Sequence, residues 1–546
     1  MSTMSNTPPG ARAPEPKVDE AAELAEKNQL SARRIAGFLL ASVTLLTVVT
    51  GVITNGFTAA RITAIPGALV IVFAMLLAFL PSFFAMGRMI RGTNKAFYAY
   101  CAVGLGRPAG VGVSFIALGA YAALQVGLYG VFGDVALTTL QPWLPPTVLG
   151  ATPSPWWFAL GAWVVTAVLG RSRLKQNSTL LLIVVAAELV WILPFTVMNF
   201  AHPAQGSSII STVDDAFIPI SVATTSIAVL ICWLAIIGIE NPPLYLSKAR
   251  EPQHRTASRA AYGSIVVMAV IYISASWSMI VTAGPSAIIG ASAVGPDMVW
   301  AMADHNVGPW FGLLGRILFL ANVPAAAVAF HTIVTMYAQN LGSEGILWSW
   351  VGKLSHRTLS PRNASAVMSA IALAVIVLAW VLGWQPTAGL FIIGGTIGAV
   401  GVVMMLFLTS LSILGHFRRN RDVYPAAQDN DAQQAEVGQA ARAGEAAAGD
   451  HDRRRHSLRI RVVAPAISAV ATFVVLCLAV ANFGLLIGDP ESNLGWVVAG
   501  IYLLFLLVGV GYALWLRRNA PIRYHKIAGD DTCADDETGA EDVAVA

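Results

Sequence analysis

Charged residues are scarce in this chain. Asp, Glu, Lys and Arg make up 12% of its 546 residues, whereas soluble domains carry about 25%. Hydrophobic residues reach 56%. This balance excludes an ordinary soluble domain and predicts an integral membrane protein. The net charge of +4 then follows from membrane topology and gives no reason to expect a nucleic acid partner.

Motifs for metal, nucleotide or covalent chemistry are also missing. The chain has no G-x-x-x-x-G-K-[ST] nucleotide loop, so an ATP-driven pump is disfavoured. No Ser-His-Asp or Cys-His arrangement lies outside the apolar stretches. We therefore expect no enzymatic activity, no cofactor and no bound metal. The four cysteines lie far apart, without metal-type spacing or a plausible disulfide framework: Cys101, Cys232, Cys477 and Cys533.

Apart from Arg61, basic residues are absent from every second connection between the long apolar stretches. Of the 34 Lys and Arg residues, only Arg61 and Arg316 lie outside the alternating basic segments. Because short cytoplasmic loops carry the basic excess, each basic segment is expected inside and each bare one outside. Both chain ends are then cytoplasmic, which requires an even number of spans, and we count twelve. The bare connections lie near 140–154, 202–216, 284–308, 384–387 and 488–493.

The expected spans are mostly near or above the ~20 apolar residues that cross a bilayer. Residues 1–34 and 518–546 are predicted to be cytoplasmic tails, the first of them disordered, and residues 417–460 a polar cytoplasmic loop. Residues 35–416 would form a ten-helix core and residues 461–517 two peripheral helices. The spans are predicted at 36–60, 64–87, 109–139, 155–170, 178–200, 217–246, 260–283, 309–340, 364–384, 388–415, 462–487 and 495–516.

Two of these spans contain residues that disfavour a helix. The first holds the polar, glycine-flanked segment Gly51–Gly56, and each glycine costs about 1 kcal/mol in a helix relative to alanine. The sixth holds Gly238, Glu240 and Pro242–Pro243, where proline removes a helical donor. The two segments stand in corresponding positions, five spans apart. That pattern indicates an inverted-repeat transporter whose site lies between two broken helices.

Three stretches resemble the amino acid–polyamine–organocation (APC) permeases. They are similar to the region of the second and third helices, to the sixth helix with its cytoplasmic loop, and to the eighth helix with its amphipathic continuation. Together they extend the resemblance over residues 36–415. The stretches are Ala96–Pro108 with Tyr121–Gly130 (YAALQVGLYG), Trp233–Ala260, and Arg316–Pro361, which includes Ala329-Phe330-His331 and Gly342-Ser343-Glu344-Gly345.

This resemblance implies a five-plus-five inverted repeat of helices 1–5 and 6–10, with helices 11 and 12 at the periphery. The substrate would lie at the midplane, between unwound parts of helices 1 and 6. Unwound helices offer N–H groups to a carboxylate and carbonyls to an ammonium group, so a zwitterionic amino acid suits both. The residues expected at this site are Thr50, Gly51, Thr54, Asn55, Gly56, Tyr121, Trp233, Gly238 and Glu240.

Two carboxylates within the spans are further candidates, because intramembrane carboxylates are costly and usually functional. Glu240 is predicted to structure the site or act as a gate, with helix capping and direct ammonium contact as alternatives. Glu188 has no basic neighbour in the sequence, and a low dielectric favours its neutral form. Glu188 is therefore the candidate for carrying a coupled proton, and a neutral packing acid is the alternative. In the fold of the permeases that this chain resembles, sodium coupling uses hydroxyl groups of helix 8. The middle of helix 8 here is the apolar run Ala325–Ala329, so sodium coupling is disfavoured.

Other polar and aromatic residues of the spans have simpler interpretations. We expect Asp134 to be a solvated charge at the outer rim and His331 to be a packing residue. Tyr129 fits a pocket or a packing position equally well.

These features predict a secondary transporter that moves amino acids across a bacterial cytoplasmic membrane by alternating access, with proton coupling expected. A permease or exchanger for amines, polyamines or nucleobases is the alternative within transport. It ranks lower, since a basic substrate would require several pocket carboxylates. A membrane sensor or scaffold that signals through residues 417–460 is the alternative from another class. The particular amino acid, the choice between symport, exchange and facilitated diffusion, the coupling ion and its stoichiometry, the direction of transport and the oligomeric state are left open.

Overall fold

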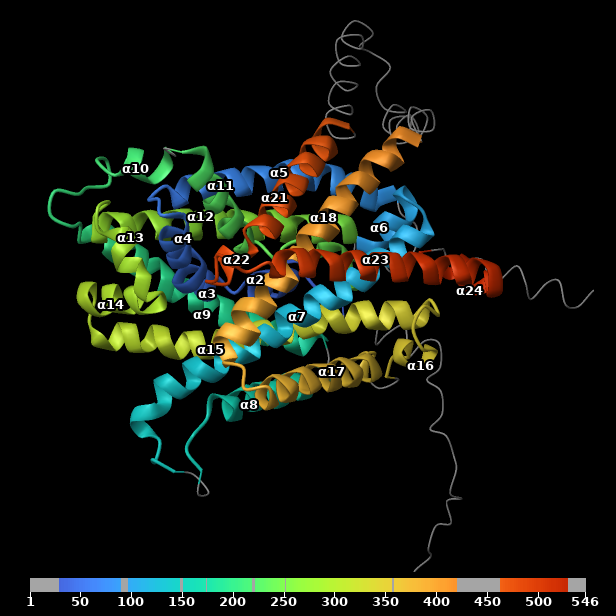
Figure 1. Ribbon diagram of the computed structural model, residues 1–546, viewed down its shortest axis with the longest axis horizontal. Coiled ribbons are helices and arrows are strands. Elements are labelled where there is room, and N and C mark those ends of the chain that lie inside the picture. Colours follow the sequence, from blue (N-terminus) through green and yellow to red (C-terminus); the bar gives the residue numbers. More distant parts are fainter. Residues whose placement is uncertain are drawn as a thin grey trace, which may run out of the picture.

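The computed structural model describes residues 29–89, 97–147, 151–172, 174–218, 221–250, 252–355, 358–419 and 462–528. The described residues form helices without a β-strand, and one isolated bridge pairs Leu30 with Ala249. Most helices run along the long axis of one bundle (Figure 1). The all-α prediction is therefore confirmed for this part of the chain. The predicted tails (1–34 and 518–546) and the predicted 417–460 loop lie mostly outside the described residues.

Ten helical segments among the described residues are long and apolar enough to cross a membrane. Each coincides with one of the predicted spans, as expected for a multi-pass membrane protein. The agreement arises because the length of an apolar run fixes the length of the helix that it can form across a bilayer. The segments are Ala32–Ala60, Ile65–Gly87, Arg107–Trp143, Gln176–Ala201, Arg255–Ala283, Pro309–Ser343, Arg362–Val381, Pro386–Arg419, Ala464–Ala481 and Leu494–Asn519.

The two remaining predicted spans contain shorter apolar helices. The fourth is α8 (Pro155–Leu169), which begins with proline at its first position after Ser154, whose hydroxyl accepts from the Trp156 N–H. The sixth consists of α11 (Val222–Leu234), a run of turns, and the 3₁₀ helix η3 (Pro242–Lys248).

The first span is continuous in space but not in helix type. It comprises α2 (Ala32–Val43), α3 (Leu45–Thr47), the π-helix η1 (Val48–Val52) and α4 (Ile53–Ala60). The other long helices are α5 (Ile65–Met89), α7 (Arg107–Leu140), α9 (Leu174–Ala201), α12 (Gln253–Ala283), α15 (Pro309–Ser343), α17 (Arg362–Val381), η5 (Pro386–Ile393) with α18 (Gly394–Arg419), α21 (Ala464–Ala481) and α23 (Leu494–Asn519).

Short helices cap the two ends of the bundle. At one end lie α13 and α14, and at the opposite end lie α6, α16 and α24 (Figure 1). We call the first the α14 end and the second the basic end, because α24 carries Arg523 and Lys526 and α6 leads to Arg107. The short elements are α6 (Phe97–Gly104), η2 (Gln141–Trp143), α10 (Val213–Phe217), α13 (Ile288–Ala291), η4 (Ser292–Val294), α14 (Pro296–Asn306), α16 (Ser349–Gly352), α22 (Phe483–Leu486) and α24 (Pro521–Lys526).

Helix α7 lies at the centre of the bundle, where it contacts α8, α15, α18 and α23. Its contact with α23 depends on two glycines, since a β-carbon on Gly509 would lie 2.5 Å from the α-carbon of Gly112. Small residues allow such close helix approach within membranes. Because α7 is held on several sides, it provides a fixed wall for the site described next.

Candidate functional site

The interruptions of the first and sixth spans lie in contact. The first span breaks at Thr44, whose backbone is left-handed (φ 59°, ψ 64°). The sixth breaks after Leu234, and Gly238 within that break has φ 113°. A β-carbon on Gly238 would lie 2.5 Å from the Ser42 hydroxyl, so only glycine fits there. The predicted interruption near Gly238 and Glu240 is thus found, and it adjoins the break of the first span.

The predicted unwinding of Gly51–Gly56 is wrong for this structure, because residues 45–60 are helical throughout. The Thr50 hydroxyl donates to the Leu46 carbonyl at 2.9 Å, and the Thr54 hydroxyl donates to the Thr50 carbonyl at 2.7 Å. These threonines therefore bond within the helix instead of competing with it. The irregularity takes the form of the π turn η1, a feature frequent at functional sites.

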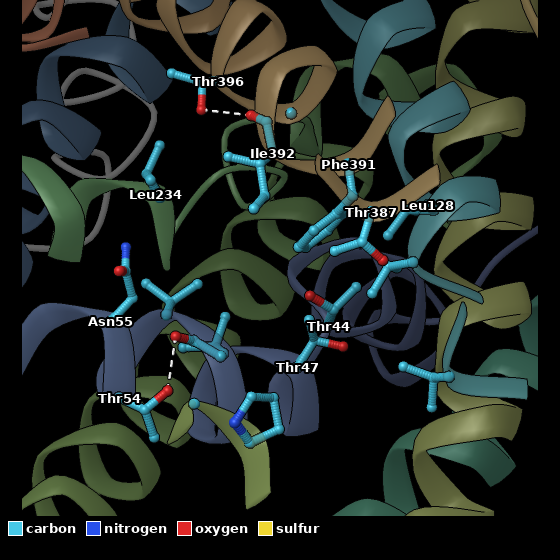
Figure 2. Close-up of a pocket in the computed structure, with 18 of the residues that line it drawn as sticks. Thr44, Thr47, Thr54, Asn55, Leu128, Leu234, Thr387, Phe391, Ile392 and Thr396 are labelled. Carbon is cyan, nitrogen blue, oxygen red and sulfur yellow. Dashed lines mark hydrogen bonds between the residues drawn. The ribbon is translucent and has the colours of Figure 1, made fainter. Parts of the chain in front are cut away.

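A cavity of about 820 Å³ lies beside the two interruptions. Its volume is within the range of roughly 300–1,000 Å³ that is typical of small-molecule sites. Threonines and an asparagine of the first span lie on one side, and η5 lies opposite (Figure 2). The wall therefore combines hydroxyl groups with apolar side chains. Residues labelled in the figure include Thr44, Thr47, Thr54, Asn55, Leu128, Leu234, Thr387, Phe391 and Ile392.

The cavity opens towards the α14 end. Its exposed rim residues include Thr138 near the end of α7 and Pro296 and Asp297 at the start of α14. None of the described residues in α6, α16 or α24, which define the basic end, lines it. The cavity is accordingly accessible from one end of the bundle and closed towards the other.

Three of the predicted site residues line the cavity. They are Gly51, Thr54 and Asn55, all on the first span. Gly51 faces open space, since a β-carbon there would have no neighbour within 4 Å. Asn55 is exposed to the cavity.

The other predicted residues lie outside the cavity lining. Thr50 is fully buried, and Gly56 packs against α5, where a β-carbon would lie 3.1 Å from Ile65. Trp233 faces a small void lined by α5, α18 and α21. Gly238, Tyr121 and Glu240 lie on the basic side of the cavity, and the latter two form a hydrogen-bonded network.

Glu240 is the centre of this network. Its side chain is 3% exposed. Its Oε1 accepts from the Tyr121 hydroxyl at 2.6 Å and from the Asn241 amide at 2.9 Å, while Oε2 accepts from the Gly238 N–H at 2.6 Å. The carboxylate therefore caps the broken backbone of the sixth span and also ties that span to α7. This geometry favours the structuring and gating interpretation over ammonium contact.

Tyrosine rings in tilted contact extend the network towards the basic end. The ring centroids of Tyr121 and Tyr337 lie 5.7 Å apart, and those of Tyr337 and Tyr98 lie 6.3 Å apart. The Tyr98 hydroxyl donates to Glu344 Oε1 at 2.6 Å. Burial, and then the Glu344 carboxylate, raises the pKa of Tyr98 well above its usual value, so Tyr98 keeps the proton that it donates. We call Glu240, Tyr121, Tyr337, Tyr98 and Glu344 the tyrosine plug.

The tyrosine plug lies between the cavity and the basic end. Along α7 the cavity lining begins at Leu124, one turn beyond Tyr121, and along α15 it ends at Phe330, two turns before Tyr337. The start of the described chain also closes this end, because the Arg250 N–H donates to the Leu30 carbonyl at 3.0 Å. The basic end is thus held shut by side-chain and backbone contacts together.

Glu188 is buried on α9 and is not among the cavity-lining residues. Its side chain is 1% exposed, and neither carboxylate oxygen has a hydrogen-bond partner among the described residues. Tyr272 of α12 lies near Glu188. The Tyr272 hydroxyl likewise has no hydrogen-bond partner among the described residues. An ionised carboxylate without partners would be very costly in such a place, so the arrangement suits a carboxylic acid that holds its proton.

Asp134 and His331 have definite partners. Asp134 lines the cavity near its rim, as expected, and its Oδ2 accepts from the Thr387 N–H at 2.8 Å, which caps the start of η5. His331 is fully buried. It lies 3.1 Å from the Gln125 amide and 2.9 Å from the Ser365 hydroxyl, and Gln125 also donates to Tyr129 at 2.7 Å. Because Gln125 donates to His331 Nδ1, Nε2 carries the proton, and the network joins α7, α15 and α17 behind the cavity.

Several lining residues were missed from the sequence. Thr44, Thr47 and Thr58 line the cavity and recur at helical spacing with the predicted Thr54 in the first span, and that periodic stripe was a readable signal. Asp297 and Arg316 also line it. They come from segments whose meeting depends on the fold, so no local pattern announces them.

Comparisons with known proteins do not place the chain in a family. No protein-family model matches it, and no curated protein matches it.

Proposed function

We propose that this protein is a secondary transporter that carries amino acids by alternating access. The observation that supports it best is the cavity between two broken helices, open at the α14 end and closed at the basic end by the tyrosine plug. Transporters of this kind place a midplane site between discontinuous helices and expose it to one side at a time. The closed end contains discrete hydrogen bonds and ring contacts, which can be broken and remade as a gate requires.

Helix contacts favour the finer proposal of a five-plus-five inverted repeat with twelve spans. Spans one and six, two and seven, three and eight, and four and nine contact each other. Reciprocal contacts occur as well: span one meets seven and span six meets two, while span three meets ten and span eight meets five. A two-fold axis that exchanges the halves generates such pairs. The remaining helices, α21 and α23, lie outside this pattern.

The proposed orientation places the basic end in the cytoplasm of a bacterial cell and the cavity mouth outside. The described basic residues concentrate at the ends of α2, α7, α12, α18 and α23 that lead to cytoplasmic connections in this arrangement, as the positive-inside rule requires. The structure would then be the outward-open form of the transporter.

A small zwitterionic substrate fits the cavity better than the alternatives. Its wall supplies hydroxyls and apolar groups, and its charged lining residues are Asp134, Asp297 and Arg316. Because a cation lines the cavity together with the two acids, an amino acid, which carries both charge signs, is favoured over a polyamine, which would be repelled by that cation. Amines and nucleobases remain the alternative substrates within transport.

Counterflow in proteoliposomes tests the proposal. Vesicles loaded with an unlabelled mixture of the twenty amino acids are expected to accumulate an external labelled mixture transiently, because exchange on a carrier needs no energy source. Empty vesicles carrying the same protein provide the control. A sensor or scaffold would give no counterflow, and this outcome would refute the transport proposal.

Glu188→Gln is expected to separate exchange from accumulation. If Glu188 carries the coupled proton, glutamine fixes its neutral form, so counterflow should persist while uphill uptake driven by a pH gradient falls to equilibration. Glu491→Gln, at an exposed position in the turn between α22 and α23, serves as the matched control. Uphill uptake by the Glu188→Gln variant at the wild-type level would leave Glu188 as a buried packing acid.

A further inference from the structure

One basic side chain enters the wall of the cavity. Arg316, on α15, is the only Lys or Arg among the described residues that lines it. Arg61, the other basic residue outside the basic segments, ends α4 in a left-handed conformation and does not line the cavity. The two arginines therefore offer a natural comparison, since both lie in apolar surroundings by sequence and only one faces the candidate site.

The guanidinium of Arg316 is incompletely satisfied. It makes no hydrogen bond to the described residues, and its nearest acid, Asp304 of α14, lies 3.8 Å away between Nη2 and Oδ2. Both side chains are about one third exposed, at 35% and 33%. Asp304 in turn has its Oδ1 buried without a described partner. An arginine presents five donors in a planar fork that matches a carboxylate, and here those donors remain available.

Two acids near the rim of the cavity affect which ligands Arg316 can bind. Asp134 is engaged by the Thr387 N–H, and Asp297 is exposed in the first turn of α14. Both line the same cavity as Arg316. A simple anion would meet one cation and two acids, whereas a zwitterion can place its carboxylate on the cation and its ammonium group among the acids. The charge pattern thus favours a ligand with both groups.

We propose that Arg316 is the carboxylate-recognition residue of the cavity and selects zwitterionic amino acids over the corresponding amines. This inference rests on the proposed transport function and specifies its binding site. Residues 50–57 are helical, so their N–H groups are bonded within the helix and are not available to a carboxylate. Arg316 would supply the donors in their place. The substrate carboxylate would bind the guanidinium of Arg316 and replace its 3.8 Å contact with Asp304. Asp304 then positions the guanidinium when the cavity is empty.

The test measures ligand affinity of purified protein by thermal shift, with each of the twenty amino acids and with the amine obtained by decarboxylating the amino acid that stabilises the wild type most. Arg316→Gln should raise the Kd for that amino acid at least about tenfold, as expected for loss of a charge-assisted pair. The Kd for the amine should stay within about twofold or fall, because a repelling cation is removed. Arg316→Lys should recover part of the affinity, and Arg61→Gln should match the wild type.

Asp304→Asn separates recognition from a structural ion pair. If Arg316 only ties α15 to α14, Asp304→Asn and Arg316→Gln should weaken binding alike. If Arg316 binds the carboxylate, Asp304→Asn should keep or improve the affinity for the amino acid. Equal losses for amino acid and amine, or no loss in Arg316→Gln, would overturn the inference while leaving transport intact. A wild type stabilised by none of the twenty amino acids would overturn this inference and the proposed function together.

Discussion

Gly51→Leu is expected to weaken amino acid binding strongly without destabilising the fold. A β-carbon at Gly51 meets no atom within 4 Å, and the residue lines the cavity. The leucine side chain would therefore occupy the space that the substrate needs. Overpacking of a filled site costs about 1–3 kcal/mol, so affinity should fall roughly fivefold to 100-fold. Leucine is also favoured over glycine in a helix by nearly 1 kcal/mol, which should preserve or raise the melting temperature.

Gly161→Leu is the matched control for this substitution. Gly161 is exposed on α8, also has no neighbour within 4 Å of a β-carbon, and does not line the cavity. Ligand-induced thermal shifts and counterflow should match the wild type in this variant and be much smaller in Gly51→Leu. Equal binding by both variants would show that the substrate does not use this cavity.

Tyr121→Phe is expected to open the basic end. The substitution keeps the ring between Tyr337 and Phe330 and removes only the 2.6 Å hydrogen bond to Glu240. The Asn241 amide still donates to Glu240 Oε1 in this variant, so the loss should be that of a typical hydrogen bond, about 0.5–1.5 kcal/mol. Because 1.4 kcal/mol corresponds to a factor of ten, the population open at the basic end should rise roughly twofold to tenfold.

Hydrogen–deuterium exchange can detect this shift in the purified protein. Exchange should accelerate in the segment that contains Tyr245 and Arg250, whose backbone N–H is bonded to Leu30 in the closed form. Tyr129→Phe is the control, since Tyr129 is an equally buried tyrosine of α7 that bonds Gln125 outside the tyrosine plug. If both variants exchange alike at the basic end, the Tyr121–Glu240 bond is not part of a gate.

The spans could be predicted from the sequence because membrane crossing depends on local properties. The length of each apolar run determined the ten long helices, and the alternation of basic connections predicted which ends of them lie together. The break of the sixth span was also readable. Gly238 and the pair Pro242–Pro243 disfavour a helix through their own backbone chemistry, whatever surrounds them.

The break of the first span could not be located in this way. Thr44 adopts a left-handed conformation that is uncommon for a β-branched residue, so its sequence gives no warning of a break. Gly51 and Gly56, which do disfavour a helix, nevertheless stay helical, and the hydroxyls of Thr50 and Thr54 bond carbonyls of the same helix.

The gate and the charged rim depend on contacts between distant parts of the chain. Tyr98 and Glu344 are 246 residues apart, and Tyr121 and Glu240 are 119 residues apart. Sequence analysis identified Tyr121 and Glu240 separately as site residues but gave no means of pairing them. Arg316 was visible as an isolated cation, and its position on the cavity wall followed only from the packing of α15 against α14.

Side-specific labelling of the cavity tests the central claim most directly. Asn55, which lines the cavity and is exposed, would be replaced by cysteine in a variant without the four native cysteines. A membrane-impermeant thiol reagent would then be applied to either face of vesicles of known sidedness, with amino acids present on both sides. Alternating access predicts labelling from the α14 face at rest and from both faces during exchange, with faster labelling from the basic face in the Tyr121→Phe background. Labelling from the α14 face alone under every condition would contradict the account.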